Sequence, residues 1–103
     1  MNNIPLKLRD ELAEETRMKV CARRDEWNCA GRITWEHAWI YAKKQIQEKW
    51  AILGICEYHH LGKGMDKRKH EWLSLQLATT EDLSKYPRKD WKQARIYLAK
   101  LFK

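Results

Sequence analysis

Hydrophobic and polar positions divide the chain into short segments with different periodicities. Residues 6–19 carry leucines at helical spacing behind Pro5, which predicts a weakly amphipathic helix. Residues 33–41 are rich in β-branched and aromatic side chains, which predict a strand, and the apolar run at 50–55 predicts a second strand that returns beside it. The polar residues 43–49 between them predict a loop or a single helical turn.

The last third of the chain is predicted to be helical. Residues 65–78 mix leucines with charged side chains, a pattern consistent with a helix. Thr80 has the composition of a helix N-terminus, although no Glu or Gln stands at the third position to complete a capping box. Pro87 separates this short helix from a final one at 89–103. The order of helix, cysteine-containing loop, two strands and helices predicts an α+β fold.

Length and composition predict one soluble domain that spans residues 1–103. A chain of 103 residues buries a modest core, so a structural metal would help to stabilise it. No apolar run approaches the about 20 residues that cross a bilayer, and the first residues lack a leader-like apolar stretch. We therefore expect a cytoplasmic protein without a membrane segment. The 6 tryptophans are expected to pack in the core rather than to stack on bases.

The charge balance favours a polyanionic partner. The chain has 21 Lys and Arg against 14 Asp and Glu, a net charge of +7. Clustered cations bind phosphates by releasing condensed counterions, which gives affinity without sequence preference. From charge alone, a solvated cationic surface explains the composition equally well.

Side chains able to bind metals gather in two short segments. Glu36 and His37 are adjacent on the first predicted strand, and the second predicted strand runs into Cys56-Glu57-Tyr58-His59-His60. Three cysteines without an export signal make disulfides less favoured than thiolate metal ligands or buried thiols. These segments predict one metal-organised site.

Simpler explanations exist for individual residues. A lone histidine on an apolar strand is more often structural than catalytic, and strand alternation separates His37 from Glu36 unless a bulge or the end of the strand intervenes. Cys21 would also fit as a small buried hydrophobe. His70 lies in a charged segment without a partner at ligand spacing, so we expect it on the surface.

Taken together, the cysteine-containing loop, the acid-His pair and the apolar strand ending in Cys-x-x-His-His resemble the HNH, or His-Me finger, nucleases. The segment from Cys56 to His60 is similar to the family's Leu-Cys-x-x-Cys-His segment, with histidine in place of the second cysteine. Trp35-Glu36-His37-Ala38 is similar to its Asp-His-Ile segment, with glutamate in place of aspartate. Residues 20–83 also resemble small phage proteins of the recombination-associated, RecA-dependent nuclease type.

This resemblance implies a small zinc-stabilised ββα-metal core with flanking N- and C-terminal helices. It implies a structural Zn2+ site whose closed tetrahedron of thiolate and imidazole ligands is formed by Cys21, Cys29, Cys56 and His59. It further implies that Glu36 and His60 bind a catalytic Mg2+ or Mn2+ and that His37 is the general base.

Two departures from the family pattern stand out. Seven residues separate Cys21 from Cys29, where zinc knuckles usually have two. The asparagine that would orient the base histidine has no obvious counterpart, which leaves Gln47 or a backbone carbonyl to orient His37.

We therefore expect a metal-dependent DNA endonuclease or nickase, in the cytoplasm of a bacterial host cell if the chain is phage-encoded. Basic residues near the predicted site are the expected phosphate contacts: Lys43, Lys44, Lys63, Lys67, Arg68 and Lys69. No base-reading element is evident, so we expect specificity from DNA structure, from a homodimer or from a partner such as a recombination protein.

Two alternatives stay open from the sequence. The missing asparagine favours a zinc-stabilised nucleic-acid-binding or protein-inhibiting accessory module without turnover. A zinc-free helical DNA-binding protein would also explain the positive charge.

Overall fold

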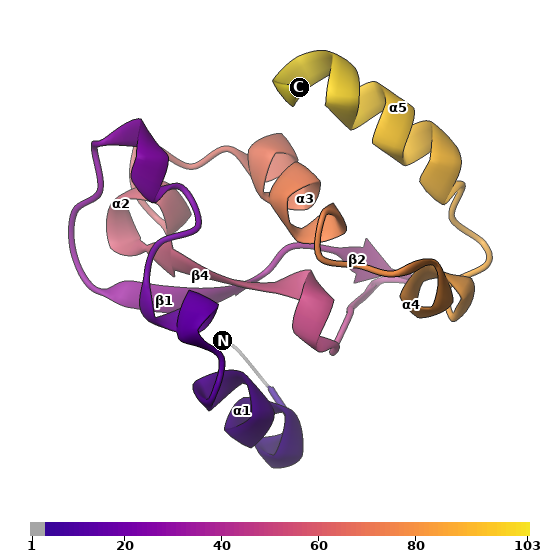
Figure 1. Ribbon diagram of the computed structural model, residues 1–103, viewed down its shortest axis with the longest axis horizontal. Helices are drawn as coiled ribbons and strands as arrows, with labels where there is room; N and C mark the ends of the chain where they lie inside the picture. The colour runs from indigo at the N-terminus through magenta and orange to yellow at the C-terminus, as the bar shows by residue number, and fades with distance from the viewer. Residues whose placement is uncertain (1–3) are drawn as a thin grey trace.

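Five α-helices and four short strands make up residues 4–103, the part of the chain that this computed structural model describes (Figure 1). The helices are α1 (Leu6–Ala13), α2 (Glu57–His60), α3 (Lys67–Leu75), α4 (Thr80–Ser84) and α5 (Trp91–Phe102). The strands are β1 (Ile33–His37), β2 (Ile40–Tyr41), β3 (Lys44–Gln45) and β4 (Ile52–Cys56). Three 3₁₀ turns are η1 (Thr16–Lys19), η2 (Arg24–Glu26) and η3 (Lys49–Ala51). These helices and strands confirm the predicted α+β class. The radius of gyration, 13.4 Å, is that of a compact chain.

Strands β1 and β4 form the antiparallel pair at the centre of the molecule. Their register runs from Ile33 opposite Cys56 to His37 opposite Ile52. Every residue of β4 is buried: Ile52 belongs to the cluster that includes Leu8 and Leu12 of α1, and Leu53 to the cluster that includes Leu75 of α3 and Leu98 of α5. This burial on both faces explains the continuous apolar run that predicted the strand.

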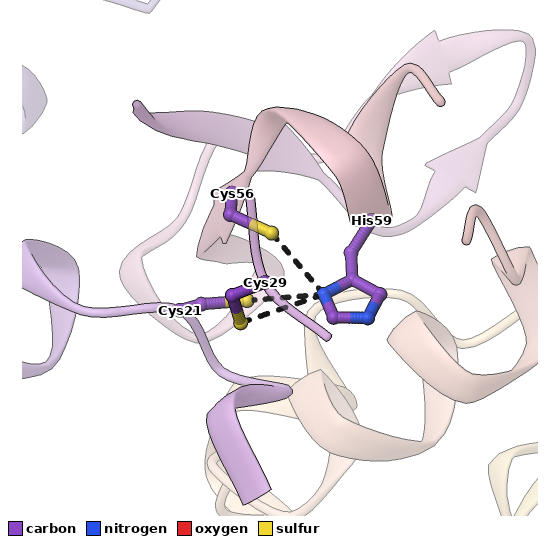
Figure 2. A group of neighbouring side chains, drawn as sticks. All are labelled: Cys21, Cys29, Cys56 and His59. Atoms are coloured by element: carbon purple, nitrogen blue, oxygen red, sulfur yellow. Dashed lines mark hydrogen bonds between the residues drawn. The ribbon is translucent and has the colours of Figure 1, made fainter. Parts of the chain in front are cut away.

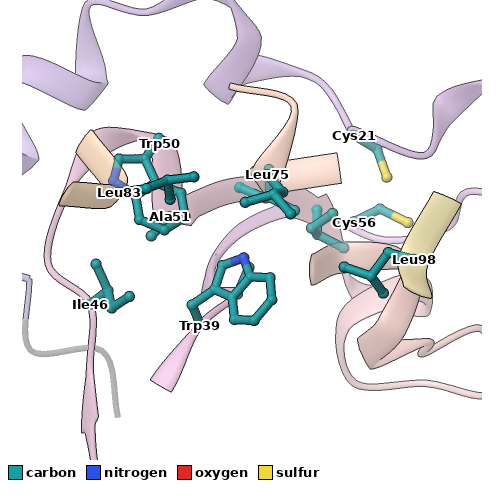
Figure 3. Close-up of a cluster of buried hydrophobic side chains, with 12 residues drawn as sticks. Cys21, Trp39, Ile46, Trp50, Ala51, Cys56, Leu75, Leu83 and Leu98 are labelled. Carbon is teal, nitrogen blue, oxygen red and sulfur yellow. The ribbon is translucent and has the colours of Figure 1, made fainter. Parts of the chain in front are cut away.

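The main core lies between the β1–β4 pair and the C-terminal helices (Figure 3). Trp91 of α5 meets the rings of Trp39 and Trp50 edge to face, at centroid distances of 5.1 and 5.8 Å. These contacts confirm core packing for three of the tryptophans. For Trp27 the same prediction is wrong, because 93% of its surface is exposed.

The N-terminal helix ends earlier than its pattern predicts, at Ala13 instead of residue 19. The chain continues in η1, where the guanidinium of Arg17 donates to the carbonyls of Ile52 and Lys49 at 2.8 and 2.6 Å. A side chain at Gly54 would approach the backbone of Met18 within about 3.0 Å, so glycine allows this segment to lie against β4. Tertiary contacts with the strand thus override the helical periodicity.

The strand predicted at 33–41 is divided in two, because β1 ends at His37 and β2 pairs with β3 instead. Ala42 and Lys43 connect β2 to β3 with positive φ angles of 52° and 68°, the backbone of a tight hairpin turn. The predicted loop at 43–49 is therefore partly a hairpin.

Two further features concern the helices. Thr79 is the N-cap of α4 and forms a complete capping box with Asp82, so the prediction of an incomplete box at Thr80 is wrong. Aspartate reaches the N-cap amide here, as glutamate does in the usual box.

None of the helices between residues 4 and 103 has the length and apolar character needed to span a bilayer.

Candidate metal centre and catalytic site

Three cysteines and one histidine converge at one end of β4. The ligand atoms of Cys21, Cys29, Cys56 and His59 all lie within 4.8 Å of one another. Figure 2 shows the three sulfurs directed toward Nδ1 of His59, at 3.6 Å from Cys21, 3.7 Å from Cys29 and 3.2 Å from Cys56. The structure thus brings together all four predicted ligands, and this Cys3His group could hold a metal ion such as zinc.

The backbone places two of these ligands from one short segment. Cys56 ends β4 and is the N-cap of α2, and His59 follows on the same helix. Residues three apart on a helix share a face, so the Cys-x-x-His spacing directs both side chains to one point.

The other two ligands reach the group through hydrogen bonds to the same strand and helix. The amide of Ala22 donates to the carbonyl of Gly54 at 2.8 Å, which holds Cys21 beside β4. The amide of Tyr58 donates to the carbonyl of Ala30 at 3.0 Å, which holds the loop that carries Cys29 against α2. The seven-residue gap between the cysteines is therefore spanned by a loop anchored at both ends.

A hydrogen bond at Nε2 of His59 orients the ring so that Nδ1 faces the three sulfurs. Its Nε2 lies 2.7 Å from Oδ1 of Asn28, an acceptor, so Nε2 carries the proton and Nδ1 presents its lone pair to the sulfurs. Burial and the charge of Arg23 lower the pKa of His59, which favours the neutral, coordinating form. The sequence analysis did not assign Asn28, whose only signal is its place beside Cys29.

The thiols cannot all ionise without a cation. Loss of solvation, together with hydrogen bonds to Cys21 and Cys56, raises the pKa of Cys29 to about 12. Burial opposes ionisation of Cys56, but backbone hydrogen bonds at His59 and Ala30 and the neighbouring thiols lower its pKa overall. One thiolate therefore suppresses another, a repulsion that a bound divalent cation removes.

The spacing of the four donor atoms fits zinc. A tetrahedral ion with sulfur bonds of about 2.3 Å and a nitrogen bond of about 2.0 Å separates each sulfur from the nitrogen by about 3.5 Å. The separations of 3.2 to 3.7 Å bracket this value.

A second group of polar side chains lies between β1 and the end of α2. Oε1 of Glu36 lies 3.6 Å from Nε2 of His60. The hydroxyl of Thr34 donates to the carbonyl of Ile55 at 2.7 Å, so it accepts from Nδ1 of His60 at 2.6 Å. In a neutral imidazole the proton is then on Nδ1, and the lone pair of Nε2 faces Glu36.

The facing oxygen of Glu36 has no hydrogen-bond donor. Oε1 is buried and has no hydrogen-bond partner among the described residues, and the whole residue is only 6% exposed. A buried carboxylate oxygen and an imidazole lone pair therefore confront each other. Such a pair is unfavourable unless a cation or a proton lies between the two atoms.

His37 stands next to this pair with one nitrogen engaged. Its Nε2 lies 2.8 Å from Oε1 of Gln47, an acceptor, so Nε2 carries the proton and Nδ1 is the basic nitrogen. That Nδ1 is buried and lacks a hydrogen-bond partner within the described chain. Of the two candidates for orienting His37, Gln47 is in hydrogen-bond contact with it.

Glu36, His37 and His60 line one cavity of about 240 Å3. The strand ends at His37, so the divergence expected from alternation does not separate His37 from Glu36. A larger hollow of about 710 Å3 between α4 and α5 contains no carboxylate or imidazole in its lining. That hollow therefore lacks the acid and base side chains that line the smaller cavity.

The prediction that His70 lies on the surface is wrong. Its side chain on α3 is 0% exposed, and its Nδ1 lies 2.5 Å from Oε2 of Glu36. The signal was helical spacing, because His70 shares the buried face of α3 with Ser74 and Leu75. This spacing was a weak signal, because polar residues such as His70 and Ser74 rarely indicate the buried face of a helix.

The predicted phosphate contacts do not form one cluster but lie at four places on the molecule. Lys43 and Lys44 are exposed at the β2–β3 hairpin, and Lys63 is exposed in the loop after α2. Lys67 lines the cavity. Arg68 and Lys69 contact α5 instead, since their cationic groups lie 5.5 and 5.3 Å from the rings of Tyr97 and Phe102 respectively.

Comparison of the chain with protein-family models, with curated proteins and with solved structures finds no match. The functional inference therefore depends on the chemistry of the two side-chain groups.

Proposed function

We propose that this protein is a metal-dependent DNA endonuclease or nickase of the HNH type. In this proposal β1, β4 and α2 are the two strands and the helix of a ββα-metal core. The Cys3His group binds a structural Zn2+ that fixes the end of β4 to α2. The fold around the site then keeps Glu36, His37 and His60 in place for chemistry.

The observation that carries the proposal is the confrontation of Glu36 Oε1 and His60 Nε2 at 3.6 Å. Both atoms are electron pair donors, because the proton of the neutral imidazole is on Nδ1, which donates to the hydroxyl of Thr34. A divalent cation held by these two atoms would relieve the repulsion. Within residues 4–103 we count Glu36 and His60 as the two protein ligands of this cation, which leaves room for a phosphate oxygen and water.

The chain's own residues divide the chemistry between them. His37 would take a proton at Nδ1 from the attacking water, while its Nε2–H donates to Oε1 of Gln47 and keeps the ring in place. Mg2+ or Mn2+ held by Glu36 and His60 would supply stabilisation of the charge that develops on the phosphoryl group and on the leaving 3′ oxygen.

DNA would approach over the exposed lysines that flank the cavity. Lys67 lies in the cavity wall and is the candidate closest to the reacting phosphate. Lys43 and Lys44 on the hairpin and Lys63 in the loop would hold the flanking backbone. Phosphate contacts of this kind give affinity without sequence preference, so a protein partner or a second copy would supply specificity.

The test is cleavage of supercoiled plasmid in the presence of Mg2+ or Mn2+, with His37→Ala as the variant. Loss of the general base predicts an about 10²- to 10⁴-fold slower reaction. Zinc content and thermal unfolding should stay at wild-type values, because His37 is outside the Cys3His group. Gln76→Ala, at the exposed C-cap of α3, is a matched control that should cleave normally.

The accessory-module alternative makes the opposite prediction. DNA binding without cleavage, whichever divalent cation or DNA form is supplied, would contradict the nuclease proposal and favour the module. The contact between His37 and Gln47 weakens the argument for that module, since the absent asparagine was its support.

A further inference from the structure

We propose that His70 is a positioning residue that holds the carboxylate of Glu36 by one oxygen and thereby presents the other to a divalent cation. The inference rests on the proposed cation site of Glu36 and His60. It adds a residue from α3 that neither coordinates the cation nor touches DNA.

The hydrogen bonds of His70 fix which nitrogen does what. Its Nε2 lies 3.4 Å from Nη1 of Arg23, and a guanidinium can only donate, so Nε2 accepts. Nδ1 therefore carries the proton and donates it to Oε2 of Glu36 at 2.5 Å. The imidazole thus lies between the guanidinium of Arg23 and the carboxylate of Glu36. Residues that hold a metal ligand in this way, without binding the metal themselves, are common around metal sites.

Arg23 is itself held firmly. It is 7% exposed, its Nε and Nη2 donate to the carboxylate of Glu26 at 2.8 and 2.7 Å, and its Nη1 also donates to the carbonyl of Gly64. Its amide donates to the sulfur of Cys21 at 3.4 Å. A chain of contacts thus runs from the Cys3His group through Arg23 and His70 to Glu36.

The consequence is a division between the two oxygens of Glu36. Oε2 is satisfied by His70, so the carboxylate cannot rotate freely, and Oε1 remains the buried acceptor that faces His60. Without the donor at His70 the carboxylate would lose the orientation that places Oε1 toward the cation. Carboxylate ligands are commonly oriented in this way, and loss of the orienting group weakens metal affinity by about 10- to 100-fold.

Two substitutions separate this role from simple packing. His70→Asn places an amide N–H where Nδ1 was, next to Glu36. His70→Gln places its amide where Nε2 was, next to Arg23, and leaves Glu36 without a donor. Both fill most of the buried volume, so they can be compared even if His70→Ala fails to fold.

The experiment measures Mn2+ affinity of the zinc-loaded protein without DNA, from the electron paramagnetic resonance signal of free Mn2+. We expect His70→Ala and His70→Gln to weaken Mn2+ binding by about 10- to 100-fold and His70→Asn to restore it to within a few-fold of wild type. Zinc content and thermal unfolding of each variant report the fold.

Each contrary outcome has a distinct meaning. If His70→Asn binds Mn2+ as weakly as His70→Gln, or if neither weakens binding while Glu36→Gln abolishes it, the positioning role is wrong and the cation site stands. If the wild-type protein binds no Mn2+, or if Glu36→Gln binds it normally, both the positioning role and the proposed cation site are overturned.

Discussion

The Cys3His group and the Glu36–His60 pair meet at α2, which carries both His59 and His60, yet they differ in how completely the protein surrounds a metal. The first gathers four donors within 4.8 Å, three of them sulfur. The second offers one carboxylate oxygen and one imidazole nitrogen across 3.6 Å. A closed set of soft ligands stabilises a fold, whereas an open set with oxygen and nitrogen leaves positions for substrate and water.

The two groups also differ in how their residues are held. His59 receives its orientation from Asn28 within the same loop region, and the other ligands are fixed by backbone hydrogen bonds. Glu36 depends on His70 from a distant helix, and His37 depends on Gln47. The Glu36–His60 pair, the open group, is therefore more easily disturbed by substitutions outside it. The Cys3His group, the closed group, would be more easily disturbed by removal of a bound zinc ion.

Removal of zinc is expected to have the largest effect. Structural zinc contributes on the order of 10 kcal/mol to folding in small domains, and the main core here is modest. Treatment with a strong chelator should abolish the cooperative thermal transition followed by circular dichroism, and Cys56→Ser should do the same.

If the protein contains no zinc and chelation leaves its unfolding temperature unchanged, the Cys3His group is not a structural zinc site. That result would favour the zinc-free DNA-binding protein considered from the sequence.

Glu36→Gln should separate activity from stability. Removing the charge should lower the cleavage rate by about 100-fold or more, since metal stabilisation of the reacting phosphoryl group is worth several kcal/mol. The unfolding temperature should stay the same or rise, because the amide can accept from His70 and donate toward the lone pair of His60. Plasmid cleavage and calorimetry on the same samples give both values. A lowered unfolding temperature together with normal cleavage would assign Glu36 to the fold instead.

Gln47→Ala is expected to act through the orientation of His37. Loss of the hydrogen bond to Nε2 should slow cleavage by about 10- to 100-fold, the effect of misplacing a reacting group by about 1 Å. Mn2+ affinity should change little, because Gln47 acts on His37, which is not one of the two proposed Mn2+ ligands. Gln45→Ala, on the same cavity, is the matched control and should cleave at nearly the wild-type rate.

Substitution of the hairpin lysines should have the smallest effect. Lys43→Gln together with Lys44→Gln should lower the slope of log affinity against log salt by about two, which corresponds to two lost phosphate contacts. Lys92→Gln with Lys100→Gln on α5 removes the same charge elsewhere and should leave the slope nearly unchanged. Equal slopes for the two double variants would exclude the hairpin from the DNA contact.

The closed group could be anticipated from the sequence to a large extent. Cys56 and His59 are one helical turn apart at the end of an apolar strand, so their proximity follows from local geometry alone. The positions of Cys21 and Cys29 depend on contacts with β4 and α2, and the family resemblance supplied what spacing could not.

The support of the open group could not be anticipated. Glu36 meets His70 across 34 residues, and Arg23 meets His70 across 47, so no periodicity links them. The end of β1 at His37 was equally hidden, because Ala38 and Trp39 continue the composition of a strand. Trp39 packs against Trp91 of α5, a contact across 52 residues that no local pattern predicts.

The most direct test of the account is the anomalous diffraction signal of crystals grown with zinc and soaked in Mn2+. We predict a zinc peak among Cys21, Cys29, Cys56 and His59 and a separate manganese peak in contact with Oε1 of Glu36 and Nε2 of His60. Manganese found only at other positions, or a direct proton-mediated contact between Glu36 and His60 at full Mn2+ loading, would contradict the proposed catalytic site.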